Sequence, residues 1–188
     1  MSDVYIVEAV RSPVGKYKGS LAGVRADHLG AHVLNALVTR AGIHPADVSD
    51  VLFGCVTQVG EQSANIARTA LLGAGWPVTI PGLAIDRKCG SGEVAVHVGA
   101  GLIAAGSAEV VVAGGAENMS RVRMGGNREI YGEAFGWLAA ERYELTSQGE
   151  AAERVAEHWK LSREALDAFA VRSHQKAAAA AEIGRAHV

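Results

Sequence analysis

Cys89 lies in the part of the sequence that is best arranged to do chemistry. It follows an apolar run over residues 80–85 and a short polar turn, and two glycines, Gly90 and Gly92, come directly after it. A long run of small residues, 93–105, then leads to a second apolar run over residues 109–114. This order predicts a strand, a tight turn, a helix and a second strand. In such a unit the two strands are parallel and the crossover is right-handed.

The predicted position of Cys89 favours a nucleophile. The first backbone N–H groups of a helix have no partner inside the helix, and the helix dipole adds partial positive charge there, so a thiolate at this point is stabilised. Gly90 and Gly92 allow a sharp turn that leaves the sulfur open to a substrate, as in a nucleophile elbow. A single cysteine is nevertheless more often an inert core residue, and position alone leaves both interpretations open.

The composition excludes several classes of protein. With 188 residues, 49% of them hydrophobic, the chain can bury a substantial core. Lys and Arg number 18 against 20 Asp and Glu, which argues against a nucleic-acid partner. Cys55 and Cys89 have no metal-ligand spacing and form no disulfide framework, so we expect no metal and a reducing, cytoplasmic location. No apolar run is long enough to cross a bilayer, and the N-terminus lacks the basic region of a signal peptide.

Apolar periodicity predicts alternating strands and helices around the Cys89 unit. The predicted elements are a strand over residues 4–10, a helix over 27–41, a strand over 51–56, a helix over 64–72, the Cys89 unit itself, and helices over 150–160 and 162–183. Asp27 and Ser162 are predicted N-caps, and Gly42 a C-cap. Alternation of this kind indicates an α/β fold. Cys55 falls inside the second strand and is predicted to be a core residue, whereas the Ala- and Gly-rich helix after Cys89 is predicted to be buried on most sides.

The remaining candidate residues are weaker. His28 and His32 lie one turn apart on a predicted helix, but no third metal ligand is evident, so we expect two ordinary surface or boundary histidines. His97 lies two helical turns after Cys89 and is expected to pack within its helix instead of acting as the base for the cysteine.

Residues 121–148 break the pattern of alternating elements. They hold scattered apolar side chains and charges of both signs. We expect an extended loop or small subdomain laid over the core, anchored by Phe135, Trp137 and Leu138, because long loops in compact domains are often functional.

The residues around Cys89 resemble the thiolases, the acyl-CoA:acetyl-CoA C-acyltransferases. The resemblance is carried by DRKCGSG at residues 86–92, by GSAEVVVAGGAENMSR at 106–121, by RSPVGKYKGSL at 11–21, by QVGEQSANIAR at 58–68, and by AERVAEHWKLSREALDAFAVRSHQKA from residue 152 on. It covers nearly all 188 residues but matches only the first half of a thiolase. The GGAENMSR segment and the RSPVG start favour a thiolase over a β-ketoacyl synthase-like condensing enzyme.

The resemblance implies a fold and a division of the chain. Thiolases have two similar halves in a five-layered αβαβα core. By resemblance, residues 1–120 are a thiolase-like N-terminal half, layered α-β-α with a mixed, mainly parallel sheet, and residues 121–188 are the start of the helical loop domain with its returning helices. The second half of the family supplies an Asn, a His and a second Cys to catalysis, and none of those motifs is found here; His97 and His158 do not match them. A half-core of this kind would also expose a large apolar face.

The resemblance also implies an activity. Cys89 would be the acylated nucleophile in thiolytic cleavage of a 3-ketoacyl-CoA to acetyl-CoA and a shortened acyl-CoA, or in the reverse Claisen condensation. CoA and acyl-CoA would be substrates, with no metal or organic cofactor. A homodimer or tetramer, or a second chain carrying the missing half, would be the partner. Ser147-Gln148-Gly149 stands where many thiolases have His-Met-Gly, which implies acyl groups bulkier than acetoacetyl, as in steroid side-chain breakdown. The alternative is a non-catalytic or truncated thiolase-like half that needs a partner subunit.

Overall fold

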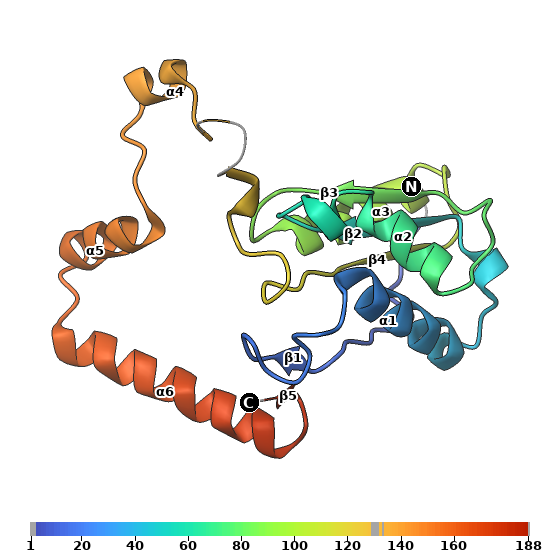
Figure 1. Ribbon diagram of the computed structural model, residues 1–188, viewed down its shortest axis with the longest axis horizontal. Helices are drawn as coiled ribbons and strands as arrows, with labels where there is room; N and C mark the ends of the chain where they lie inside the picture. The colour runs from blue at the N-terminus through green and yellow to red at the C-terminus, as the bar shows by residue number, and fades with distance from the viewer. Residues whose placement is uncertain (1–2, 129–131, 133, 188) are drawn as a thin grey trace.

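The computed structural model of the chain, which describes residues 3–128, 132 and 134–187, shows an α/β core and a helical arm that projects from it (Figure 1). The sheet of the core consists of β2 (Asp50–Gly54), β3 (Gly82–Ile85) and β4 (Val111–Gly115), in the order β3-β2-β4. All three strands are parallel, in line with the mainly parallel sheet that we expected. Because the three strands are parallel, their carboxyl ends meet along one edge of the sheet.

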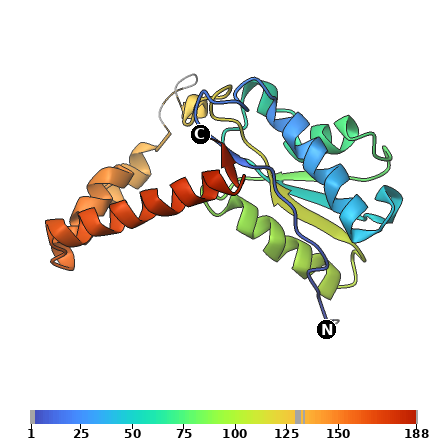
Figure 2. The same cartoon turned by 90° about the horizontal axis from the view of Figure 1, so that it is seen from below.

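Helices cover both faces of this sheet. Helices α1 (Ala26–Ala41) and α2 (Ile66–Gly73) lie on one face and α3 (Ser91–Ala104) lies on the other, so the core has three layers (Figure 2). The central strand supplies the middle of the core, and its residues Val51 and Leu52 are completely buried. The predicted α-β-α arrangement is therefore confirmed.

The predicted C-cap of α1 is confirmed, whereas its predicted N-cap is not. Gly42 ends the helix in the left-handed conformation (φ 68°), where glycine carries no steric penalty. The predicted N-cap, Asp27, is wrong by two residues: Arg25 is the N-cap, and Asp27 lies in the first turn. Asp27 forms an ion pair with Arg25 there, and an acidic side chain in the first turn also complements the helix dipole.

The predicted strand over residues 4–10 is not formed. This N-terminal segment is extended but has no backbone ladder to β4 or to any other described strand. Its side chains Tyr5, Ile6 and Val7 are 75%, 81% and 80% exposed. The β-branched residues set an extended conformation correctly, but a strand also requires a hydrogen-bonding neighbour, and the sequence pattern does not report one.

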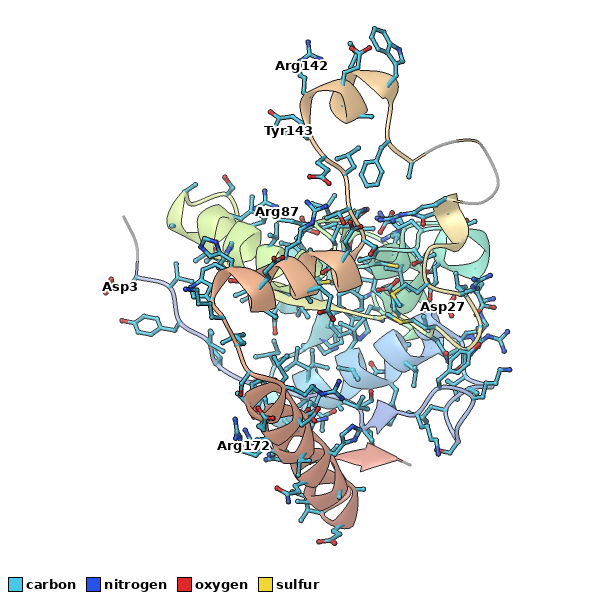
Figure 3. All side chains as sticks on the ribbon, turned by 90° about the vertical axis from the view of Figure 1, so that its left-hand side faces the viewer. Asp3, Asp27, Arg87, Arg142, Tyr143 and Arg172 are labelled. Carbon is cyan, nitrogen blue, oxygen red and sulfur yellow. The ribbon has the colours of Figure 1, made fainter. Side chains whose placement is uncertain are left out.

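The helical arm consists of three helices that pack little against the core. These are α4 (Trp137–Arg142), α5 (Gln148–His158) and α6 (Arg163–Glu182), and none of them has a buried residue. Figure 3 shows Arg142, the last residue of α4, and Tyr143, directly after it, far from the core; Arg172 lies on α6. The helices predicted over residues 150–160 and 162–183 are confirmed to within two residues, and Ser162 is the predicted N-cap of α6.

The predicted anchors of this region are more than half exposed. Phe135, Trp137 and Leu138 are 56%, 68% and 51% exposed, so the expectation that they hold residues 121–148 over the core is wrong. Apolar side chains in a sequence indicate that a surface is to be buried, but they do not identify the surface that buries them.

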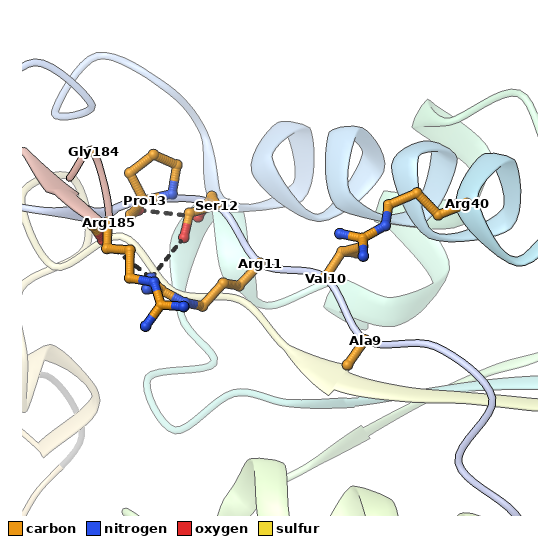
Figure 4. A pocket seen from close by; sticks show the side chains of 8 residues that line it. All are labelled: Ala9, Val10, Arg11, Ser12, Pro13, Arg40, Gly184 and Arg185. Atoms are coloured by element: carbon orange, nitrogen blue, oxygen red, sulfur yellow. Dashed lines mark hydrogen bonds between the residues drawn. The ribbon is translucent and has the colours of Figure 1, made fainter. Parts of the chain in front are cut away.

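The far end of the arm returns to the N-terminal loop. Strand β5 (Ala186–His187) pairs in parallel with β1 (Val14–Gly15), and the N–H of Val14 donates to the carbonyl of Arg185 at 3.2 Å. The Nη1 of Arg11 donates to the same carbonyl at 3.1 Å (Figure 4). The remaining short elements are the 3-10 turns η1 (Pro45–Asp47), η2 (Gly60–Gln62) and η3 (Gly126–Arg128). None of the described helices is both long and apolar enough to span a bilayer.

A network of four charged side chains joins α1, η2 and the loop after β4. Arg121 binds Glu61 through two contacts, Nε to Oε1 at 2.6 Å and Nη2 to Oε2 at 2.9 Å. Arg25 bridges the network, with Nη1 3.2 Å from Glu61 and Nη2 2.8 Å from Asp27. The hydrogen bond from Arg121 is the main cause of a lowered pKa for Glu61. Burial opposes the charge of Asp27, but Arg25 outweighs it, so the pKa of Asp27 is lowered as well.

This network predicts a loss of stability in acid. Because the folded-state pKa values of Glu61 and Asp27 lie below the ordinary values of 4.5 and 3.8, their stabilisation is present above those values and is lost as the pH falls through the lowered ones. We expect the free energy of unfolding in urea to fall between about pH 5 and pH 2. Glu61→Gln should be less stable at pH 7 and should lose less on acidification. An equally steep fall in both proteins would show that the network is not responsible.

Candidate active site

Cys89 lies at the carboxyl edge of the sheet, between the end of β3 at Ile85 and the start of α3 at Ser91. Gly90 is the N-cap of α3, and the side chain of Cys89 is exposed. The predicted sequence of strand, turn and helix is thus confirmed. The role of Cys89 as a nucleophile stays a prediction.

Ser91 holds the turn that carries Cys89. Its Oγ accepts the N–H of Arg87 at 2.8 Å and donates to the carbonyl of Lys88 at 2.6 Å. Gly90 closes the same turn, donating its N–H to the carbonyl of Arg87 at 3.0 Å. Lys88 is in the left-handed region (φ 49°), which a non-glycine residue adopts only when its surroundings enforce it. The backbone on both sides of Cys89 is therefore fixed.

Asp86 supports Lys88 in this conformation. Its Oδ1 accepts the backbone N–H of Lys88 at 2.8 Å, and its Oδ2 lies 2.5 Å from the Lys88 ammonium. Burial works against the charge of Asp86, but the hydrogen bonds and charge of Lys88 outweigh it, so the pKa of Asp86 lies below its ordinary value. Asp86 is therefore a carboxylate at neutral pH and keeps this contact.

Gly54 brings the start of α3 directly against the central strand. A Cβ atom on Gly54 would lie 2.5 Å from the backbone nitrogen of Gly92 and 2.6 Å from the carbonyl carbon of Ser91. Only glycine allows this approach of the two backbones. The approach in turn fixes the distance between the start of α3 and the end of β2. Sequence reasoning did not single out Gly54, although a glycine inside a strand pattern is a recognised signal of close backbone approach.

Buried amides connect the loops that follow β2 and β4 at the same edge. The side chain of Gln62 donates to the carbonyl of Thr57 at 2.8 Å and accepts the N–H of Asn118 at 3.0 Å. Glu117 accepts the N–H of Thr57 at 2.9 Å, and Asn118 donates to the carbonyl of Val24 at 2.7 Å. These hydrogen bonds hold the two loops in place. Because ligands of parallel α/β sheets bind at the carboxyl edge, the loops form rigid surroundings for the candidate site.

Asn65 and Arg68 brace the segment that leads into β3. Asn65 caps α2 in the left-handed conformation (φ 54°), and its amide donates to the carbonyl of Gly82 at 2.7 Å. Arg68 donates to the carbonyl of Val78 at 2.9 Å and to that of Ile80. Through Asn65 and Arg68, the QVGEQSANIAR segment therefore fixes β3, the strand that precedes Cys89.

Cys55, directly after β2, is a core residue as predicted. It is 1% exposed. Burial, and to a lesser extent the nearby charge of Glu117, raises the pKa of its thiol to about 12. At neutral pH the reactive thiolate form of Cys55 is nearly absent.

The two cysteines should therefore differ sharply in reactivity. We expect iodoacetamide at pH 7.5 to alkylate Cys89 at least a hundredfold faster than Cys55, because only Cys89 is exposed and the thiolate of Cys55 is suppressed. Peptide mass spectrometry of timed samples gives both rates, and the same reaction in urea should remove most of the difference. Equal rates in the folded protein would contradict this assignment.

The described histidines make no contact with Cys89. His28 and His32 are exposed, and the described residues contain no group of three or more side chains that could hold a metal. His97 is exposed and lies 3.8 Å from Glu93 of the same helix, so the expectation that it packs within the helix is wrong. His158 packs edge-on against Trp159 in the arm.

Helix α3 is less buried than predicted. Only Ser91, Ala95 and Gly99 are buried, whereas Val96 and Val98 are exposed. The sheet covers one side of the helix, and no described element covers the opposite side. An Ala- and Gly-rich helix can pack closely on several sides, but here only one side has a partner.

Comparison with known proteins gives a consistent result. The family model "Thiolase, N-terminal domain" matches residues 4–187. A steroid 3-ketoacyl-CoA thiolase of Mycobacterium tuberculosis is 41% identical over 98% of this chain and 47% of its own length. A beta-ketoadipyl-CoA thiolase of Pseudomonas putida is 42% identical over 98% of this chain and 50% of its own.

Among solved structures, the acetyl-CoA acetyltransferase of Bacillus anthracis superposes with a TM-score of 0.77 at 37% identity. The match covers 95% of this chain and 48% of that one. The chain thus spans about half the length of the curated relatives it matches.

Proposed function

The chain belongs to the thiolase family, with the N-terminal domain of that family matched over residues 4–187, and from this premise we propose that it is the nucleophile-bearing half of a thiolase-type acyltransferase. The observation that carries the proposal is the position of Cys89. It is exposed at the carboxyl edge of the sheet, on a turn held by Ser91 and Gly54 at the start of α3.

The proposed reaction has two steps. In the first, the thiolate of Cys89 attacks the 3-keto carbon of a 3-ketoacyl-CoA, the bond between carbons 2 and 3 breaks, and its electron pair leaves on acetyl-CoA, which takes up a proton at carbon 2. In the second, the thiol of free CoA loses its proton and attacks the acyl-Cys89 thioester, which releases the shortened acyl-CoA and regenerates the Cys89 thiolate. The first step consumes the 3-ketoacyl-CoA and free CoA enters only in the second, and neither step needs a metal or an organic cofactor.

Proton transfer in these steps needs groups beyond those near Cys89. A general base has to lie within hydrogen-bonding reach of the proton that it removes, and no histidine among the described side chains lies there. We propose that the other half of a full-length thiolase provides the acid and base, within the same assembly. We also propose that this assembly is a homodimer or a tetramer.

The proposed substrate class follows the relatives. The matched proteins include thiolases for steroid 3-ketoacyl-CoA and beta-ketoadipyl-CoA, both with acyl groups larger than acetoacetyl. In this chain Ser147 is the N-cap of α5, where its Oγ accepts the N–H of Glu150 at 3.2 Å. We propose that the arm, residues 121–188, is the start of the loop domain and that it faces the acyl group of a bulky 3-ketoacyl-CoA.

Incubation with acetyl-CoA tests the proposal. We expect the intact protein to gain the mass of one acetyl group, and peptide mapping to place it on Cys89. The experiment is done with the chain alone and with the C-terminal half of a relative added. If the protein has the correct mass and gains no acetyl adduct in either case, the result would favour the alternative of a non-catalytic thiolase-like half.

A further inference from the structure

Lys88 directly precedes Cys89, and a single carboxylate holds its side chain. The Lys88 ammonium lies 2.5 Å from Oδ2 of Asp86, and the backbone N–H of Lys88 donates to Oδ1 of the same residue at 2.8 Å. No described residue other than Asp86 pairs with this ammonium. Because 60% of the Lys88 side chain is exposed, the ammonium is tied at one point and is otherwise open to solvent.

The backbone of the turn fixes Lys88 and Cys89 relative to each other. The carbonyl of Lys88 accepts the N–H of Ser91 at 3.0 Å and the Ser91 hydroxyl at 2.6 Å. Lys88 itself is held in the left-handed region (φ 49°). The side chain of Cys89 is exposed like that of Lys88. Two reactive side chains therefore leave one rigid turn at consecutive positions, and both reach solvent.

This placement sets an amine beside a thioester whenever Cys89 carries an acyl group. Consecutive Cα atoms lie about 3.8 Å apart, and a lysine has a flexible four-carbon stem. Rotation of the side chain is therefore enough to bring the Lys88 nitrogen to the carbonyl carbon of an acyl group on Cys89. Groups held on one rigid frame react as in an intramolecular reaction, at effective concentrations far above those in solution. The product, an amide, is much more stable than a thioester, so the acyl group does not return to sulfur.

Asp86 opposes such a transfer in two ways. A lysine attacks a carbonyl only as the free amine, and a carboxylate in contact with an ammonium favours the protonated form. The nitrogen also has to leave Asp86 before it can approach the acyl group. Only 29% of the Asp86 side chain is exposed, so solvent screens this contact less than it screens a fully exposed pair.

We propose that Lys88 is a site of self-acylation that takes its acyl group from Cys89, and that Asp86 is the positioning residue that keeps this transfer slow. The free amine of Lys88 attacks the thioester carbonyl of acyl-Cys89, the carbon–sulfur bond breaks, and the sulfur leaves as the Cys89 thiolate. The nitrogen gives one proton to solvent, and an amide remains on Lys88. The step needs no oxidant, reductant or further reactant. It rests on the proposed function in one respect, which is that Cys89 becomes acylated.

The proposed transfer leaves a specific signature. Acylation removes the positive charge of Lys88, and with it the ion pair to Asp86. Each transfer also restores the free sulfur of Cys89, which can then be acylated again. The protein therefore accumulates two acyl groups, one on Cys89 as a thioester and one on Lys88 as an amide. Hydroxylamine cleaves the first and leaves the second.

Mass spectrometry tests the transfer directly. The chain is incubated at pH 7.5 with acetyl-CoA and, in parallel, with the acetyl thioester of N-acetylcysteamine, a small reagent that exchanges onto exposed thiols without enzymatic help. Intact masses before and after hydroxylamine count the thioesters and amides, and peptide mapping locates them. We expect an amide on Lys88 to form slowly after the thioester on Cys89. Asp86→Asn should form this amide at least tenfold faster, because asparagine can still accept the N–H of Lys88 but carries no charge to pair with the ammonium.

Two further variants separate the proposed route from a general change in charge. Glu93→Gln removes a negative charge from the first turn of α3, where the side chain lies near His97 and not near Lys88, and it should change the rate of amide formation less than threefold. Cys89→Ala removes the sulfur that supplies the acyl group, and amide formation on Lys88 should fall at least tenfold. Thermal unfolding shows that each variant is folded. The comparison with Cys89→Ala leaves Asp86 unchanged, so it tests the transfer even if Asp86→Asn does not fold.

Several outcomes would overturn this proposal. These are equal rates of amide formation in the wild-type and Asp86→Asn proteins, equal acetylation of Lys88 with and without the sulfur of Cys89, and the absence of any thioester on Cys89 with both reagents. A thioester that forms from acetyl-CoA but never moves to Lys88 would refute this inference alone. A chain that is loaded only by the small thioester, and then transfers the acetyl group to Lys88, would count against the proposed function alone.

Discussion

Replacement of Cys89 by alanine is expected to abolish acyl transfer. The variant should form no acetyl adduct with acetyl-CoA, and in an assembly completed by the C-terminal half of a relative the rate of thiolysis should fall by about 10⁴-fold or more, the scale seen when a catalytic nucleophile is removed. The reason is that the acyl-enzyme route of the two-step reaction passes through a single sulfur. Intact-mass spectrometry follows the adduct, and an assay of the thioester bond or of the free CoA thiol follows the rate of thiolysis.

Cys55→Ala is the matched control for this experiment. Cys55 is buried and has a pKa raised to about 12, so its removal should leave the acetyl adduct in place and lower stability only through the lost packing. Thermal unfolding shows whether each variant is folded. An acetyl adduct on Cys89→Ala, or its loss in a folded Cys55→Ala protein, would reject Cys89 as the nucleophile.

The second large effect is expected at Gly54. An alanine there would place its Cβ atom 2.5 Å from the backbone nitrogen of Gly92, a separation that real Cβ contacts do not show. The obstacle is backbone, so no side chain can rotate away, and the start of α3 has to move. We expect Gly54→Ala to lower the free energy of unfolding by about 1–3 kcal/mol or more, the range for overpacking in a core.

The same substitution should slow the chemistry of Cys89, because the turn that carries it is attached to the part of α3 that moves. The rate of acetylation should therefore fall even under conditions where the variant stays folded. Gly101→Ala in the same helix is the control: nothing lies within 4 Å of its Cβ position, and alanine is favoured over glycine inside a helix by about 0.5–1 kcal/mol. A Gly54→Ala protein as stable and as reactive as Gly101→Ala would refute the role of this contact.

The elements around the site could be predicted because their signals are local. An apolar run, a polar turn and glycines at residues 90 and 92 defined the strand, turn and helix around Cys89, and the structure confirms all three. Gly42 and Ser162 were also predictable, since capping depends on neighbouring residues only.

The features that sequence reasoning missed depend on distant partners. Gly54 meets Ser91 and Gly92 across more than thirty residues of chain, and no local pattern reports that approach. Residues 4–10 have the composition of a strand, but pairing requires a neighbour that the described chain does not place beside them. Phe135 and Trp137 are apolar enough to be buried, yet the sequence does not say by what. For Gly54 and residues 4–10 the extended conformation was predictable and the contact was not, whereas helix α4 (Trp137–Arg142) was not predicted at all.

The arm leaves the core and returns to it at the same loop. Ser120, at its start, accepts the N–H of Lys18 at 2.8 Å, and Arg185, at its end, accepts the N–H of Val14. The cost of closing such a loop grows only slowly with its length. Insertions, deletions and replacement within α4, α5 and α6, none of which has a buried residue, are therefore compatible with an unchanged core. The turn that bears Cys89 can therefore keep its shape while the arm changes in length and sequence, and under the proposed function such changes would adapt one core to different acyl groups.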